Sequence, residues 1–184
     1  LHRRLHNNDR AIYYLEQIKE MAEELNYLPG KCRAYFDLGA IYNENKEYER
    51  ALDYELKVVE ISRSINLKQY EIASMATVAQ IYSEGFGEHT KAEEYANDAM
   101  KIADEFGDSS LQRAIWLILS DIYRRQGMFR QSGEFGLKAW GIPSKELDMN
   151  RRLLSNLTWA NIHLGNIDKA ISFFEDYENA TNEF

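Results

Sequence analysis

Hydrophobic residues recur along the chain with the spacing of amphipathic α-helices. The clearest example is the set Tyr35, Leu38, Gly39 and Tyr42. Its intervals of three, one and three residues place large side chains and one small residue on a single helical face. Such a face packs closely against a neighbouring helix, because the small residue lets the two backbones approach. The pattern therefore predicts paired helices and an all-α fold.

The same spacing returns about every forty residues along the chain. It is found again at Met75, Val78, Ala79 and Tyr82, at Trp116, Leu119, Ser120 and Tyr123, and more weakly at Leu154, Leu157, Thr158 and Asn161. A second pattern lies between these segments and consists of a small residue followed by aliphatic or aromatic ones. It begins at Ala11, Ala51, Ala92, Ser132 and Ala170. The chain is therefore predicted to repeat a pair of helices.

Turn-forming residues divide this pattern into nine or ten helices. Gly127 and Gly165 mark predicted turns between the two helices of a pair. Asp108 or Ser109 is expected to cap the helix that follows Gly107, because a short polar side chain there can accept hydrogen bonds from the first free backbone amides. Ser144 is predicted to cap the next-to-last helix for the same reason.

These residues together resemble the tetratricopeptide repeat (TPR) family, and the segment 33–54 carries the family pattern best. The repeats exceed the roughly 34 residues of the standard form. In this they are similar to the longer variety found in kinesin light chains and bacterial signalling regulators. The resemblance implies one TPR-like right-handed α–α superhelix, a solenoid of antiparallel helix pairs, over 1–184. Its predicted divisions are a partial repeat at 1–28 and repeats at about 29–66, 67–107, 108–143 and 144–184.

Some positions depart from the family pattern. Glu55, Ala96 and Gly136 stand where the family usually has an aromatic residue. Gly136, together with Gly133, also falls inside a predicted helix, where each glycine costs about 1 kcal/mol relative to alanine. We therefore expect residues 130–140 to be the least stable helix of the array.

The two ends of the chain lack the expected covering helices. Because Ala11 holds the second-helix position, residues 1–5 are predicted to end a first helix, with a turn at His6. The last predicted helix begins near Ile167, and no further helix follows it. Repeat arrays need polar terminal helices to cover their apolar faces. We interpret the chain as a fragment of a longer protein, or as one whose ends contact another copy.

Composition excludes several classes of function. The net charge is −8 and no run of Lys or Arg occurs, so binding of nucleic acid through this segment is not expected. The single cysteine, Cys32, allows neither an intrachain disulfide nor a cysteine-based zinc site. The longest uncharged stretch, 153–167, is shorter and more polar than a membrane span. We expect a soluble segment, and the sequence leaves open whether it is cytoplasmic or periplasmic.

No set of residues has the spacing of a catalytic or metal-binding motif. His2 and His6 have helical spacing but lack a third ligand nearby. The Gly-x-Gly at 85–87 follows no strand, so it does not indicate a phosphate-binding loop. Cys32 has no histidine beside it that could activate a thiolate. We therefore predict no enzymatic activity, no cofactor and no metal.

The resemblance implies a surface for binding a protein or peptide. In TPR folds the first helix of each pair lines the concave side, and we call it the inner helix and its partner the outer helix. The implied function is a binding module that forms the sensory or scaffolding part of a larger bacterial regulatory protein. The predicted partner-binding residues are Phe36, Ala40, Asn43, Ala76, Gln80, Ser83, Leu117, Asp121, Arg124, Arg125, Ser155, Trp159, Ile162 and His163.

Several alternatives stay open at this surface. Trp159 either anchors a partner or packs against the last outer helix, and Arg124 with Arg125 either binds a carboxylate or pairs with neighbouring acids. The family's clamp for chaperone tails requires Lys and Asn where this chain has Phe36 and Ala40, so that activity is not expected. An alternative function is structural self-association through the terminal helices, without a ligand in the groove.

Overall fold

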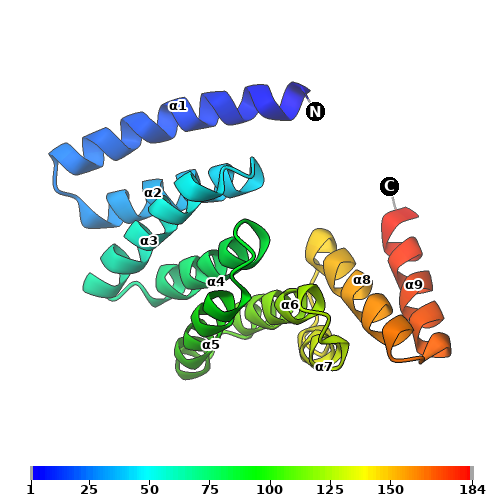
Figure 1. Cartoon of the computed structure of the whole chain (residues 1–184). Helices are drawn as coiled ribbons and strands as arrows, with labels where there is room; N and C mark the ends of the chain where they lie inside the picture. The colour runs from blue at the N-terminus through cyan, green and yellow to red at the C-terminus, as the bar shows by residue number, and fades with distance from the viewer. Residues whose placement is uncertain (1, 183–184) are drawn as a thin grey trace. The chain divides into compact units, whose positions relative to one another are not determined.

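The computed structural model describes the backbone of residues 2–182 and the side chains of residues 8–179. Within this range the chain forms helices and no strand, which confirms the predicted all-α fold (Figure 1). The nine helices of the described range are α1 (His2–Glu24), α2 (Leu28–Glu44), α3 (Tyr48–Ser64), α4 (Lys68–Glu84), α5 (His89–Phe106), α6 (Ser109–Arg125), α7 (Phe129–Trp140), α8 (Leu147–His163) and α9 (Ile167–Asn182).

The helices form two compact units. Unit 1 extends to Gly87 and contains α1 to α4, whereas unit 2 begins at Glu88 and contains α5 to α9. Within each unit, consecutive helices pack side by side. The inner helices also contact each other directly, α2 with α4 in unit 1 and α6 with α8 in unit 2. Each unit therefore presents a pair of adjacent inner helices.

The core of unit 1 follows the predicted pattern of large and small residues. Leu38 and Tyr42 of α2 pack with Ala51 of α3 and Ile81 of α4, and all four are buried. The Tyr42 ring stacks on the Tyr54 ring with centroids 5.5 Å apart. The methyl side chain of Ala51 lets α3 approach α2 closely enough for these rings to stack. The small residues predicted to lie at such helix contacts are all buried: Gly39, Ala51, Ala79, Ala92, Ser120, Ser132 and Ala170.

In unit 2 a pair of serines joins α6 to α7. The Ser120 hydroxyl donates to the Ser132 carbonyl at 2.8 Å, and the Ser132 hydroxyl donates to the Ser120 carbonyl at 2.9 Å. Both side chains are fully buried. Next to them, a Cβ added at Gly136 would lie 2.9 Å from Cδ2 of Leu157. The glycine therefore allows α8 to approach α7, which explains why no aromatic residue fits there.

The predicted helix boundaries are partly confirmed. Asp108 caps α6, because its carboxylate accepts from the amides of Ser110 at 2.9 Å and Leu111 at 3.2 Å. Gly127 and Gly165 adopt the left-handed φ angles of 73° and 75° that end α6 and α8. The prediction that Ser144 caps α8 is wrong. The helix begins at Leu147 after Glu146, and the Ser144 hydroxyl instead accepts from the Glu146 amide within the preceding turn.

The prediction of a helix end at residues 1–5 is also wrong. A single helix, α1, runs from His2 to Glu24 without a turn at His6. No glycine or proline occurs in this segment, so nothing in the sequence interrupts the backbone hydrogen bonds of the helix. The side chains of His2 and His6 lie outside the described residues, so their predicted spacing as metal ligands is not compared with the structure.

Candidate functional site

The predicted partner-binding residues lie on the inner helices of both units. Those on α2 and α4 belong to unit 1, and those on α6 and α8 belong to unit 2. On each helix they follow one another at intervals of three or four residues, which places them on one face.

On α2 of unit 1, Phe36, Ala40 and Asn43 are half-buried. The Phe36 ring meets the Tyr70 ring of α4 edge to face, with centroids 5.2 Å apart. This contact joins the two inner helices of the unit. Part of the Phe36 ring is thereby covered by Tyr70, and the remainder is accessible, as are parts of Ala40 and Asn43.

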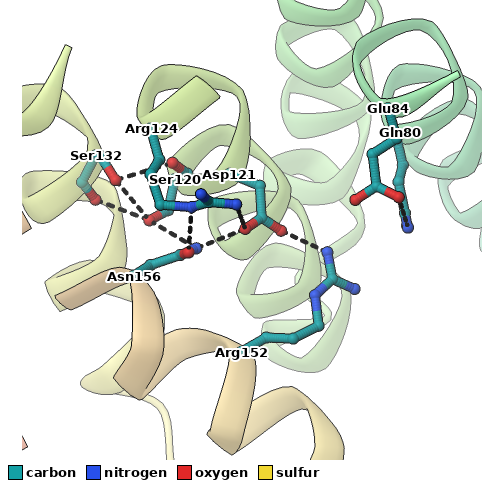
Figure 2. A network of polar contacts seen from close by, with 8 residues as sticks. All are labelled: Gln80, Glu84, Ser120, Asp121, Arg124, Ser132, Arg152 and Asn156. Atoms are coloured by element: carbon teal, nitrogen blue, oxygen red, sulfur yellow. Dashed lines mark hydrogen bonds and ion pairs between the residues drawn. The ribbon is translucent and has the colours of Figure 1, made fainter. Parts of the chain in front are cut away.

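On α4 the predicted residues divide into buried and half-buried side chains. Ala76 and Ser83 are about 95% buried, so a partner cannot contact them without moving the helix. Gln80 is half-buried and donates to the Glu84 carboxylate at 3.2 Å (Figure 2). The C-terminal end of this helix therefore presents an amide and a carboxylate.

In unit 2 the inner helices are joined by a polar network around Asp121, which is buried (Figure 2). The Asn156 side-chain amide donates to Asp121 Oδ1 at 2.7 Å, and Arg152 forms an ion pair with Asp121 Oδ2. Arg124 Nε donates to Asn156 Oδ1 at 2.8 Å. The Asn156 amide also lies 3.3 Å from the Ser120 hydroxyl. Residues of α6 and α8 thus hold one another in fixed positions.

Two arginines flank the carboxylate of Asp121. Arg152 forms an ion pair with Oδ2, and Arg124 Nη2 lies 4.0 Å from Oδ1. The Asn156 amide directs its oxygen toward Arg124 and its nitrogen toward Asp121, which fixes both partners. The side chains of Arg124 and Arg152 remain 31% and 42% exposed. They can therefore still contact a ligand.

Trp159 is 50% exposed, so it is not buried against the last outer helix. Its ring stacks on the exposed His163 ring with centroids 5.6 Å apart, and His163 stacks on Phe129 of α7 at 3.7 Å. Ile162, beside them, is also 45% exposed. The C-terminal end of α8 therefore carries a stack of three aromatic rings, in which Trp159 is half exposed.

The remaining predicted residues of unit 2 differ in accessibility. Leu117 packs with Leu153 and Leu157 in the core, so its side chain does not reach the surface. Ser155 is half-buried and Arg125 is exposed. The surface that a partner can reach is thus narrower than the sequence indicated.

Sequence reasoning missed Arg152, Asn156 and Phe129. Along α8, Arg152, Asn156, Trp159 and His163 follow one another at intervals of four, three and four residues, which places them on one face. That spacing, together with the Arg151-Arg152 pair, is the feature of the sequence that indicates a shared polar and aromatic face on this helix. We call the accessible residues Arg124, Arg152, Trp159 and His163 the α6–α8 strip.

Unit 1 also contains a buried carboxyl group, that of Glu55 on α3. It is 1% exposed, and neither carboxyl oxygen accepts a hydrogen bond from the described residues. Burial raises the pKa of Glu55 to about 8, and the nearby Ser74 hydroxyl offsets this only in part. Burial, with a smaller contribution from Glu55, raises the pKa of Cys32 to about 11. The Cys32 thiol is therefore protonated at neutral pH and a poor nucleophile.

Among side chains 8–179, no group of three or more His, Cys, Asp or Glu residues is arranged to hold a metal ion. Within the described part of the chain, no helix combines the length and apolar character required to cross a membrane.

The terminal helices expose apolar side chains on one face each. These are Tyr14, Ile18 and Met21 on α1, which are 50–61% exposed, and Ile167, Ile171 and Phe174 on α9, which are 47–54% exposed. On both helices the intervals are three or four residues, as expected for a face that packs against another helix.

The chain is similar to several known proteins. Residues 1–64 match the family described as Tetratricopeptide repeat. The 43 kDa receptor-associated protein of the synapse from Tetronarce californica is 34% identical over 100 residues, which make up 52% of this chain and 24% of that protein. The chain thus spans about a quarter of the length of this curated relative.

Solved structures resemble the chain over nearly its whole length. BtubC from P. vanneervenii has a TM-score of 0.79 at 14% identity, over 99% of this chain and 77% of that one. A kinesin light chain with nearly identical TPR-like repeats from Podosopora anserina has a TM-score of 0.69 at 18% identity, over 98% of this chain and 92% of that one. These matches confirm the predicted fold class, an all-α helical repeat of the TPR kind.

Proposed function

We propose that the chain is a protein- or peptide-binding module whose inner helices contact the partner, because residues 1–64 match the tetratricopeptide repeat family and the fold is of that kind. The observation that carries this proposal is the α6–α8 strip. It combines an exposed tryptophan with two arginines that are oriented by Asn156 and Asp121. Trp and Arg are the residues that contribute most to binding at protein interfaces. The module binds without catalysing a reaction.

The inner-helix face of unit 1 contributes a second contact area under this proposal. It offers Phe36, Ala40, Asn43 and Gln80, which are half-buried and of mixed polarity. Ala76 and Ser83 support this face from beneath rather than contact the partner, since their side chains are buried. Leu117 is likewise buried within unit 2.

The proposal is tested by screening the protein against a peptide array. The test variant combines Trp159→Ala with Arg124→Glu, and the matched control combines Trp140→Ala with Arg130→Glu on the outer helix α7, where Trp140 is 40% exposed. We expect the test variant to lose the peptides that the wild type binds and the control to keep them. Equal binding by all three proteins would show that the strip is not the binding site.

The module is further proposed to be the sensory or scaffolding part of a larger bacterial regulatory protein. This part of the proposal is supported by the repeat length of about forty residues, which is similar to that of bacterial TPR regulators. Sequencing the complete reading frame tests it. We expect the frame to encode an output domain beside the repeats, and a frame without one would contradict this part.

The exposed apolar faces of α1 and α9 favour a second candidate function, self-association through the terminal helices. Light scattering across a concentration series distinguishes the two functions. Self-association predicts a mass that rises with concentration in the wild type and falls back in an Ile18→Lys, Ile171→Lys variant. A monomer at high concentration would exclude it.

A further inference from the structure

We propose that the contact between α2 and α3 in unit 1 is a pH-sensitive gate. The gate is closed while the Glu55 carboxyl is protonated, and it opens and exposes the Cys32 thiol when Glu55 loses its proton. This inference does not depend on the proposed binding function, because the gate lies within unit 1 and needs no partner. It is carried by the burial of Glu55, by the surroundings of its carboxyl group, and by the position of Cys32.

The Glu55 carboxyl lies where α3 packs against both α2 and α4. It is 1% exposed, and it packs so closely on the backbone of α2 that a Cβ at Gly39 would lie 2.7 Å from Oε1. The group that faces it from α4 is the Ser74 hydroxyl, and the titratable group that faces it from α2 is the buried Cys32 thiol. Among the described residues, neither carboxyl oxygen has a hydrogen bond or an ion pair. Burial without a counter-charge therefore raises the pKa of Glu55 to about 8.

A second buried carboxyl group of unit 1 shows that burial alone does not make a gate. Glu71 of α4 is 2% exposed, yet its carboxylate forms ion pairs with Arg63 Nε at 2.9 Å and with Lys68 Nζ at 2.7 Å. Because two cations balance its charge, Glu71 is stable as a carboxylate in the folded unit. Glu55 has no such partner among the described residues, so its ionisation leaves an uncompensated charge in the core.

The charge of Glu55 opens the contact on the α2 side. On the α4 side the Ser74 hydroxyl can donate to the carboxylate, which favours the charged form. On the α2 side the carboxylate packs against Gly39 and lies close to the Cys32 thiol, whose own ionisation it disfavours. Separation of α3 from α2 therefore brings water to the carboxylate, keeps its contact with α4, and uncovers Cys32. A local opening of this kind costs less free energy than unfolding of the whole chain.

Alkylation of Cys32 by iodoacetamide measures the opening. Cys32 is the single cysteine of the chain, so the mass of the whole protein reports its reaction. The thiol itself reacts faster as the pH rises, and each rate is therefore divided by that of Glu55→Gln at the same pH. We expect this ratio to rise about fiftyfold from pH 6 to pH 8. The reason is that the closed form holds the Glu55 proton with a pKa of about 8, whereas the opened form releases it near the ordinary value of 4.5.

Two further variants assign the effect to the buried carboxyl group. Glu60→Gln removes an exposed carboxylate from the same helix, and its rates should follow those of the wild type at every pH. Glu55→Met replaces the carboxyl group by an uncharged side chain of similar length, and its rates should depend on pH as those of Glu55→Gln do. If the buried amide of Glu55→Gln prevents folding, Glu55→Met carries the test, since methionine buries no strong hydrogen-bonding group.

The dependence on urea separates opening of the gate from unfolding of the whole chain. Opening exposes less surface than unfolding, so the logarithm of the alkylation rate should rise with urea at less than about half of the slope found for global unfolding. Equal slopes would overturn the gate, because Cys32 would then be reached only by unfolding. A ratio of rates that stays constant from pH 6 to pH 8 would also overturn it.

Discussion

The buried carboxyl group of Glu55 makes the stability of unit 1 depend on pH, and Glu55→Gln should remove this dependence. In the folded protein the pKa of Glu55 is raised from about 4.5 to about 8, because burial disfavours the carboxylate. Between these two values the folded state keeps a proton that the unfolded chain has released. Unfolding therefore releases a proton, and the folded state loses stability as the pH rises through this range.

The size of the effect follows from the pKa shift. Each pH unit between about 4.5 and 8 lowers the free energy of unfolding by about 1.4 kcal/mol. From pH 5 to pH 7 the wild type should therefore lose about 3 kcal/mol through this group alone. Glutamine has the same shape without the titrating proton, so the variant should have a similar stability near pH 5 and a greater one at pH 7 to 8.

Urea denaturation followed by circular dichroism at pH 5, 6, 7 and 8 measures this difference. The matched control is Glu60→Gln, which removes an exposed carboxylate from the same helix. We expect the free energies of unfolding of the wild type and Glu60→Gln to change in parallel with pH. The free energy of unfolding of Glu55→Gln should exceed that of the wild type by an amount that grows as the pH rises. A constant difference between wild type and Glu55→Gln across this range would refute the reasoning.

The packing supports three further predictions. Ala51→Leu should lower stability by about 1–3 kcal/mol in thermal melts, because a larger side chain overpacks the contact between α2 and α3, and unchanged melting would contradict the assigned register. Asp108→Ala should cost about 1 kcal/mol in the same assay through loss of the α6 cap, whereas Asp108→Asn should largely restore it. Hydrogen exchange should be faster at residues 130–140, with their two glycines, than in α5, and equal protection would contradict this.

The regular part of the fold could be predicted from the sequence because its signals are local. The three, one, three spacing around Gly39 and the small residue at Ala51 report which helical faces meet, and both positions are buried. Asp108 next to Gly107 is a local capping signal of the same kind. Ser144 does not cap α8, because the loop that contains Pro143 continues to Glu146 and the helix begins only at Leu147. The length of this loop depends on its packing, which is not a local signal in the sequence.

The candidate site could be predicted only in part, because its geometry depends on contacts between residues more than thirty positions apart. The α8 partners of Asp121 and Arg124 are Arg152 and Asn156, and nothing in the sequence alone pairs them. The repeat register predicts Leu117 on the accessible face, whereas in the structure its side chain packs with Leu153 and Leu157 of α8. The spacing of α8 fits both a buried and an exposed Trp159, and the structure shows it 50% exposed.

The central claim is that a partner docks on the inner helices, and site-specific photo-cross-linking tests it most directly. A photoreactive benzophenone residue replaces Ser155, which lies between Arg152 and Trp159 on α8, or Lys101, which is exposed on the outer helix α5. We predict that a peptide recovered from the array cross-links to the protein from position 155 and not from position 101. Cross-linking from position 101 alone would contradict the claim.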